Sequence, residues 1–391
     1  MYPRTLKSPL KFDSSFFLFG ARSTGKSSWL KENFKEVKLI DLLDSDVFHD
    51  LEANPNSLEK FIPANYKDWI IIDEVQKIPA LLDVVHRLIE NKQIKFILTG
   101  SSARKLKREG VNLLAGRALT YKFYPLTIEE LGQDFDLIKS LKYGNLPKVQ
   151  SSQDEAYIEK YLSSYIKTYL KEEIRFEGFV RNLGDFSRFL EAASFSQGSV
   201  LNISTVAREA SIKQKTATSY FDLLEDMLIS YRLPTFTKRA KRKVIQHSKF
   251  YFFDVGIFKT IRPTGILDSE QEVNGPALET LVLQELLAIN DYHELGYEIN
   301  YWRTNDGAEV DFILYGPRGL IAIEIKCARK ISRDDLSGLK SFSKDYPQAE
   351  LYIFYTGNRE EFHGEIKVLP VEEALKGLKK ILDGSSPSLR Y

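Results

Sequence analysis

The stretch Phe16–Leu30, FFLFGARSTGKSSWL, decides how the first third of the chain folds. It contains Gly20 and Gly25 with four residues between them, and a Lys-Ser pair follows the second glycine. The apolar run before Gly20 is typical of a buried parallel strand, and the residues after the loop predict a helix. A glycine-rich loop in this context places backbone N–H groups at a helix N-terminus, where they can bind phosphate.

The loop predicts an ATP site. Lys26 can reach the β- and γ-phosphates, and the hydroxyl of Ser27 can bind Mg²⁺. A chance glycine turn is the alternative interpretation, and the complete spacing between a strand and a helix argues against it. The other predicted nucleotide-binding residues of the loop are Gly20, Ala21, Arg22, Ser23, Thr24, Gly25 and Ser28.

Two later apolar runs end in polar residues that suit ATP hydrolysis. The first run leads to Asp73 and Glu74, at the edge of an α/β sheet where ligands bind. Asp73 can hold Mg²⁺ through water, and Glu74 can orient and deprotonate the attacking water. The second run ends at Thr99 and Ser101, whose hydroxyls we expect near the γ-phosphate.

Arg117 follows a glycine in the segment LLAGRALTYKFYPLT. An arginine here can stabilise the charge of the transition state, either in its own subunit or from a neighbouring one. A surface salt bridge is the equally open alternative.

These segments resemble a prokaryotic family of AAA+ ATPases of the AAA_14 type fused to a C-terminal DUF4143 region. The resemblance rests on GARSTGKS, IIIDEVQKIP, FILTGSSARKL and AGRALTYKFYPLTIEEL, with YPR and KYGNLPKV elsewhere. It implies that Lys26, Ser27, Asp73 and Glu74 belong to the two nucleotide motifs. It also implies that Ser101 or Thr99 is the polar sensor. Because AAA+ sites form between subunits, it further implies a homo-oligomer.

The middle of the chain predicts helices followed by a helix–turn–helix–strand order, which is the outline of a winged-helix module. Lys213 and Lys215 lie on the expected second helix and suit contacts with DNA phosphates. A basic loop follows where a wing would be, and it would make binding sensitive to salt. A solvated loop or a protein contact is the alternative. The basic residues are Lys238, Arg239, Lys241, Arg242 and Lys243.

The last third predicts a β-hairpin that carries acids. EVDFIL contains Asp311, and LIAIEIK, after a turn, contains Glu324 and Lys326, so the hairpin brings Asp311 beside Glu324. Glu324 and Lys326 are two residues apart and therefore share a face. Carboxylates bind Mg²⁺ or Mn²⁺, and an upstream helix can add Glu279.

This pattern resembles the PD-(D/E)xK nuclease superfamily, the fold of restriction endonucleases and archaeal Holliday-junction resolvases. Twelve residues, 312 to 323, separate Asp311 from Glu324, and Val310 stands where proline is usual. The resemblance implies catalysis by Asp311, Glu324 and Lys326 with a metal bound by Asp311, Glu324 and Glu279. A salt-bridged hairpin, or a degenerate fold kept for binding, is the alternative.

The sequence therefore predicts an α/β multidomain protein. The expected domains are an AAA+ P-loop domain at 1–150, a helical and winged-helix domain at 151–262 and a restriction-endonuclease-like α/β domain at 263–391.

A net charge of +1 means that nucleic-acid binding needs a local basic patch. Cys327 is the only cysteine, and no apolar run reaches the roughly 18 residues of a membrane span. We expect a cytoplasmic protein without an internal disulfide framework or a membrane partner.

Three hypotheses about function remain open from the sequence. The first is an ATP-dependent DNA-processing enzyme whose C-terminal domain cuts DNA. The second is a nucleotide-switched module that remodels DNA or protein and carries a catalytically inactive nuclease-like domain. The third is a defence or regulatory NTPase that acts on proteins alone.

Overall fold

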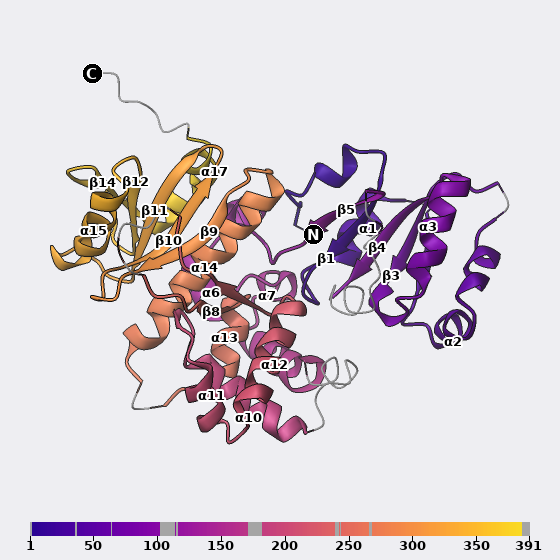
Figure 1. The fold of residues 1–391 in the computed structure, drawn as a ribbon, viewed down its shortest axis with the longest axis horizontal. Helices are drawn as coiled ribbons and strands as arrows, with labels where there is room; N and C mark the ends of the chain where they lie inside the picture. Colours follow the sequence, from indigo (N-terminus) through magenta and orange to yellow (C-terminus); the bar gives the residue numbers. More distant parts are fainter. Residues whose placement is uncertain are drawn as a thin grey trace. The chain divides into compact units, whose positions relative to one another are not determined.

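The fold is given by a computed structural model, which divides the chain into two compact units (Figure 1). The N-terminal unit comprises Pro3–Pro125 with Asp226–Ile229, and the larger unit comprises the rest of the chain. Residues 126–150, expected with the ATPase domain, group with the larger unit. The described residues are 2–35, 37–63, 65–101, 114, 116–170, 182–238, 242, 244–265 and 268–384.

The N-terminal unit contains a five-stranded parallel sheet in the order β2-β3-β4-β1-β5. The predicted strand before the phosphate loop and the predicted helix after it are both present. The strands are β1 (Ser15–Phe19), β2 (Lys38–Asp41), β3 (Trp69–Asp73), β4 (Lys95–Gly100) and β5 (Ala118–Lys122). The helices are α1 (Lys26–Asn33), α2 (Ser45–Ala53) and α3 (Leu81–Lys92).

The strand order positions the polar ends of three strands. β4 lies between β1 and β3, so residues that follow β4 come close to both the phosphate loop and Asp73. Side chains of β1, β3 and β4 form a core with α3, which includes Phe17, Ile70, Leu98 and Leu88. Burial of these apolar side chains holds the carboxyl ends of the strands in register.

The first part of the larger unit is mainly helical. Its helices are α5 (Ile128–Leu131), α6 (Leu137–Tyr143), α7 (Pro147–Gln150), α8 (Glu155–Ser164), α10 (Leu183–Ser194), α11 (Ile203–Glu209), α12 (Gln214–Asp226) and α13 (Val255–Ile261), with a π-helical segment at Tyr165–Leu170. A small antiparallel sheet, β6-β8-β7, accompanies them. Its strands are β6 (Ser199–Val200), β7 (Ser230–Leu233) and β8 (Lys249–Phe252).

The C-terminal part of the larger unit contains a mixed six-stranded sheet in the order β13-β14-β12-β11-β10-β9. The strands are β9 (Glu298–Arg303), β10 (Glu309–Gly316), β11 (Gly319–Lys326), β12 (Glu350–Tyr355), β13 (Glu361–His363) and β14 (Ile366–Pro370). The helices are α14 (Glu270–Tyr292), α15 (Ser337–Asp345), α16 (Val371–Lys376) and α17 (Leu378–Leu382). Both α14 and α15 contact β11, the strand that carries Glu324.

Among the described residues, no helix combines the length and the apolar composition needed to cross a membrane.

Candidate functional site

The phosphate loop ends at Gly25, whose φ of 101° lies in the left-handed region that favours glycine. This conformation starts α1 at Lys26, which is buried. The Lys26 ammonium donates to the carbonyl oxygens of Gly20 at 2.6 Å and Ala21 at 3.2 Å. Thr24 Oγ1 also donates to Ala21 O at 2.7 Å, so the loop is internally bonded and keeps its lysine close to the backbone cradle.

Arg4 holds this loop from outside the motif. Its guanidinium donates to Thr24 O at 2.7 Å and to Tyr124 O at 2.8 Å, and it lies 4.0 Å from the centre of the Phe123 ring. A Cβ on Gly20 would lie 2.4 Å from Phe123 O, so this glycine is needed for the close approach of the two segments. Arg4 lies in the YPR segment, which contributes to the family resemblance but predicts no role for Arg4 itself.

Polar side chains meet at the ends of β3 and β4. Thr99 Oγ1 donates to Asp73 Oδ1, and Glu74 follows with a φ of 59°. Gln76 was not predicted, yet its Nε2 donates to Glu74 and, at 3.1 Å, to Ser101 Oγ. The backbone N–H of Glu74 donates to Asp73 Oδ1 at 3.1 Å and joins these contacts. The four predicted residues Asp73, Glu74, Thr99 and Ser101 therefore belong to one hydrogen-bonded group with Gln76.

Arg117 forms an ion pair with Glu90 of α3. The Arg117 side chain is partly exposed, and the pair lies within the N-terminal unit. This contact is the salt bridge that the sequence left open as one of two roles for Arg117.

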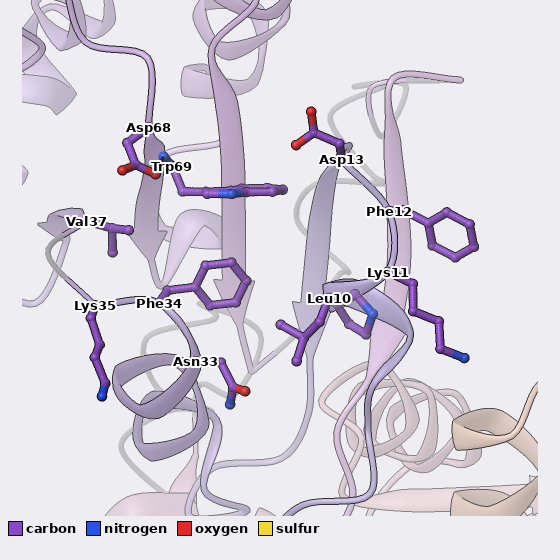
Figure 2. Close-up of a pocket in the computed structure, with 11 residues that line it drawn as sticks. Leu10, Lys11, Phe12, Asp13, Asn33, Phe34, Lys35, Val37, Asp68 and Trp69 are labelled. Carbon is purple, nitrogen blue, oxygen red and sulfur yellow. Dashed lines mark hydrogen bonds between the residues drawn. The ribbon is translucent and has the colours of Figure 1, made fainter.

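A hollow of about 530 Å³ lies elsewhere in the N-terminal unit (Figure 2). Its lining includes Asp13, which precedes β1, and Asp68 and Trp69 at the start of β3. In a parallel sheet these starting residues share the edge opposite the carboxyl ends of the strands. The hollow is therefore distinct from the predicted nucleotide site.

The predicted hairpin is present in the larger unit. β10 and β11 are antiparallel, and Phe312 pairs with Ile323, which brings the start of β10 to the end of β11. The pairing of β10 with β9 shifts register between Val310 and Ile313, so Asp311 lies at an irregularity of its strand. Asp311 Oδ2 accepts a hydrogen bond of 2.9 Å from the backbone N–H of Ile325.

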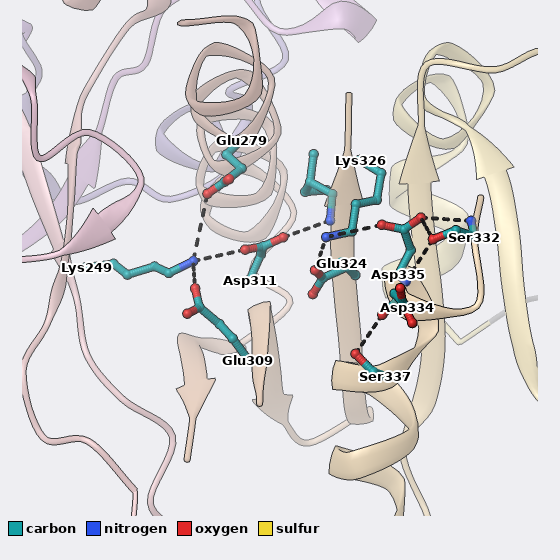
Figure 3. Close-up of polar contacts among 11 residues, drawn as sticks. Lys249, Glu279, Glu309, Asp311, Glu324, Lys326, Ser332, Asp334, Asp335 and Ser337 are labelled. Atoms are coloured by element: carbon teal, nitrogen blue, oxygen red, sulfur yellow. Dashed lines mark hydrogen bonds and ion pairs between the residues drawn. The ribbon is translucent and has the colours of Figure 1, made fainter. Parts of the chain in front are cut away.

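Lys249, which was not predicted, extends from β8 into this acidic region (Figure 3). Its ammonium lies 2.9 Å from Asp311 Oδ1 and 3.9 Å from Glu279 Oε2, and it forms an ion pair with Glu309. Burial disfavours the charged lysine, but Tyr251, Asp311, Glu279 and Glu309 together raise the pKa of Lys249 above its ordinary value.

Glu324 and Lys326 form the other half of the acidic region. As the two-residue spacing predicts, they are close, and Lys326 Nζ donates to Glu324 Oε1 at 2.7 Å. Burial raises the pKa of Glu324 above its ordinary value, and the charge of Asp311 adds to this effect. The second carboxylate oxygen, Oε2, is buried and has no hydrogen-bond partner among the described residues.

Glu279 joins the same region from α14. Its Oε2 accepts a hydrogen bond of 2.8 Å from the Tyr251 hydroxyl. Burial raises the pKa of Glu279, and the nearby charge of Asp311 raises it further. The structure thus brings Glu279 and Asp311 together around Lys249, as well as Glu324 and Lys326 beside them.

Carboxylate oxygens are the ligands that a hard divalent cation such as Mg²⁺ or Mn²⁺ prefers, and Oε2 of Glu324 has no hydrogen-bond partner among the described residues. In the part of the chain that the structure describes, however, no three His, Cys, Asp or Glu side chains converge as a metal site. The carboxylates of Glu279, Glu309 and Asp311 instead surround the ammonium of Lys249.

The predicted DNA-contacting residues have different surroundings. Lys213 and Lys215 are exposed at the start of α12. Lys238 pairs with Glu298 at 2.6 Å and Arg242 with Asp345 at 2.7 Å, so both make contacts within the larger unit. Arg239, Lys241 and Lys243 lie outside the described residues.

Comparison with known proteins finds relatives across most of the chain. An uncharacterized protein of Haemophilus influenzae is 25% identical over 300 residues, which cover 72% of this chain and 70% of the relative. An uncharacterized protein of Mycobacterium tuberculosis is 27% identical over 317 residues, which cover 78% of this chain and 69% of the relative.

Solved structures show weaker likenesses. The Aeropyrum pernix ORC1 protein, solved in complex with DNA, matches with a TM-score of 0.25 and 11% identity over 66% of this chain and 89% of that one. A Pyrococcus horikoshii STAND protein, a signal transduction ATPase with a tetratricopeptide repeat sensor, has a TM-score of 0.24 and 14% identity over 76% of this chain and 48% of that one.

Three family models match successive parts of the chain. An AAA domain, AAA_14, matches residues 13–132, and two domains of unknown function follow, DUF8612 at 134–268 and DUF4143 at 274–374. The AAA match covers the five-stranded parallel sheet and the phosphate loop. The chain is thus a mixed α/β multidomain protein with an AAA domain at residues 13–132 and, C-terminal to it, DUF4143 at residues 274–374.

Proposed function

We propose that the protein binds and hydrolyses ATP at the phosphate loop and uses this cycle to act on DNA. The observation that carries the ATPase proposal is the hydrogen-bonded group at the ends of β3 and β4, beside the strand that leads into the loop. Lys26 would bind the β- and γ-phosphates, and Ser27 and Asp73 would hold Mg²⁺, which neutralises phosphate charge when bound. Glu74 would orient the attacking water.

We further propose that the C-terminal domain cleaves DNA. Asp311, Glu324 and Glu279 would supply the oxygen ligands for Mg²⁺ or Mn²⁺, and the bound ion would supply Lewis acidity at the scissile phosphate. Lys326 would position the attacking water, because its ammonium is bonded to Glu324 and its side chain is 29% exposed. Oε2 of Glu324 is buried and has no hydrogen-bond partner in the part of the chain that the structure describes, which supports a role beyond a salt bridge.

Contact with DNA is proposed for the region around α12. The element order α10, β6, α11, α12, β7, β8 is compatible with the predicted winged-helix module. Lys213 and Lys215 are exposed there and would bind phosphates, which makes affinity depend on salt.

Cleavage of labelled duplex, single-stranded and four-way-junction DNA tests this function. We would compare the wild type with Glu324→Ala and Lys26→Ala, in Mg²⁺ or Mn²⁺, with and without ATP. The matched controls are Glu350→Ala, a paired glutamate of β12, and Lys31→Ala, an exposed lysine of α1. We expect cutting that Glu324→Ala abolishes and Lys26→Ala weakens, while both controls cut normally.

A nucleotide-switched remodeller with an inactive nuclease-like domain is the second candidate. The position of Lys249 among the carboxylates favours it, because an ammonium already neutralises part of the acidic region. This candidate predicts ATP turnover and ATP-dependent binding of DNA or protein without cleavage of any substrate. Cleavage that Glu324→Ala removes would exclude it.

A further inference from the structure

Lys249 is a buried cation at the centre of three acids. Only 2% of its side chain is exposed, and its ammonium contacts Asp311, Glu309 and Glu279. Figure 3 shows the ammonium between these carboxylates, which extend from α14 and β10. Asp311 and Glu279 are largely buried and Glu309 is partly exposed. Burying acids side by side is costly unless a cation compensates them, and Lys249 supplies that charge.

Burial also separates the role of Lys249 from that of Lys326. Lys326 is 29% exposed and can approach a substrate, whereas the enclosed ammonium of Lys249 cannot contact a DNA phosphate where it lies. Lys249 therefore acts on the acids and not on a substrate.

The acids retain other partners if the ammonium leaves. Glu309 Oε2 lies 3.1 Å from Arg303, and Glu279 accepts a hydrogen bond from Tyr251. Asp311 keeps the backbone N–H of Ile325 on Oδ2, which leaves Oδ1 for another cation. The buried Oε2 of Glu324, on the adjacent strand β11, has no hydrogen-bond partner among the described residues.

We infer that Lys249 is an exchangeable counter-ion that fills the cation position between Asp311 and Glu279, so that a divalent cation binds there only when the ammonium is displaced. The exchange would regulate the proposed nuclease site, and its biological meaning rests on that proposed function. Hard oxygen ligands suit Mg²⁺ and Mn²⁺, and a divalent cation would replace the single charge of the ammonium with a double charge.

The exchange would couple cation binding to a second sheet of the larger unit. Lys249 is the first residue of β8, which lies between β6 and β7, whereas Asp311 belongs to β10 of the six-stranded sheet. Cation binding would therefore release a contact between these two sheets of the larger unit.

Mn²⁺ binding to the full chain without nucleotide tests the inference, with titration calorimetry and the electron paramagnetic resonance of free Mn²⁺ as readouts. We expect Lys249→Met to bind Mn²⁺ at least about tenfold more tightly than the wild type, because a competing charge is removed. The matched control is Lys367→Met, because Lys367 of β14 also pairs with a glutamate, Glu350 of β12. This variant should bind Mn²⁺ as tightly as the wild type.

A second substitution shows where the gained cation lies. Lys249→Met combined with Asp311→Asn should lose the gain, and a gain that persists would place the cation elsewhere and overturn the inference. Equal or weaker Mn²⁺ binding by Lys249→Met would also overturn it. If Lys249→Met does not fold, it can be combined with Glu309→Gln, which removes one of the uncompensated negative charges. This double variant should likewise bind Mn²⁺ more tightly than the wild type, and equal or weaker binding would overturn the inference.

These readouts need no substrate, so they separate this inference from the proposed nuclease. Tighter Mn²⁺ binding without cleavage would support the exchange and contradict the nuclease. Cleavage by the wild type with unchanged Mn²⁺ affinity in Lys249→Met would contradict only the exchange.

Discussion

Gln76 connects the side chain proposed to orient the attacking water with a hydroxyl of the next strand. It donates to Glu74 and, at 3.1 Å, to Ser101. Its position is tightly constrained, since a Cβ on Gly100 would lie 2.3 Å from Gln76 Oε1. We therefore propose that Gln76 positions Glu74.

Replacing Gln76 tests this role. We expect Gln76→Leu to lower kcat for ATP hydrolysis by roughly 10- to 100-fold, because a small displacement of a catalytic group costs a rate of this order. KM should change little, since Gln76 is not expected to contact the nucleotide. Steady-state kinetics give both constants, and Gln133→Leu, at an exposed glutamine, is the control. An unchanged kcat would contradict the role.

At the scale of single elements, helix α13 depends on a buried acid. Asp254 precedes the helix, and its carboxylate accepts hydrogen bonds from the N–H groups of Gly256 at 2.9 Å, Ile257 at 3.2 Å and Asn145 at 2.8 Å. Burial raises the pKa of Asp254 to about 6, although these backbone donors oppose the rise.

This raised pKa predicts a dependence of stability on pH. The folded chain holds the proton of Asp254 at a pH where the unfolded chain has lost it. The contribution to stability is therefore complete below about pH 4 and is lost as the pH rises through about 6, by up to about 3 kcal/mol in the free energy of unfolding.

Urea unfolding across this pH range measures the effect. Asp254→Asn carries no titrating proton and should reduce the loss of stability between about pH 4 and about pH 7. Asp136→Asn changes the exposed cap of α6 and should retain the wild-type slope. Equal slopes in the wild type and Asp254→Asn would show that this acid is not responsible.

At the scale of the whole molecule, the proposed ATPase predicts assembly. AAA+ sites form between subunits, so ATP should favour association of this chain with further copies. We expect Glu74→Gln, which should hold ATP without hydrolysing it, to sediment faster with ATP than without it. Lys26→Ala should not respond to ATP. Sedimentation velocity measures this response, and a monomer at every concentration with ATP bound would contradict assembly.

Much of the candidate site could be predicted because its signals are local. The strand and helix around Gly20–Ser27 follow from an apolar run, two spaced glycines and a helical segment. The proximity of Glu324 and Lys326 follows from the two-residue repeat of a strand. The families at residues 13–132 and 274–374 agree with the resemblance drawn from these segments.

The site residues that the sequence did not predict lie far along the chain from the residues that they contact. Arg4 contacts Tyr124 across 120 positions, and Lys249 contacts Asp311 across 62. No periodicity or spacing encodes such pairs, since they depend on which elements pack together.

By itself, therefore, the sequence determined the phosphate loop, the acidic ends of the strands and the hairpin with its Glu-x-Lys pair. These features depend on the conformations of neighbouring residues. Only the tertiary structure decided that Gln76 joins Glu74 to Ser101, that Arg117 pairs with Glu90 and that Lys249 lies among the acids. The physical reason is that burial and charge compensation act between side chains that folding brings together.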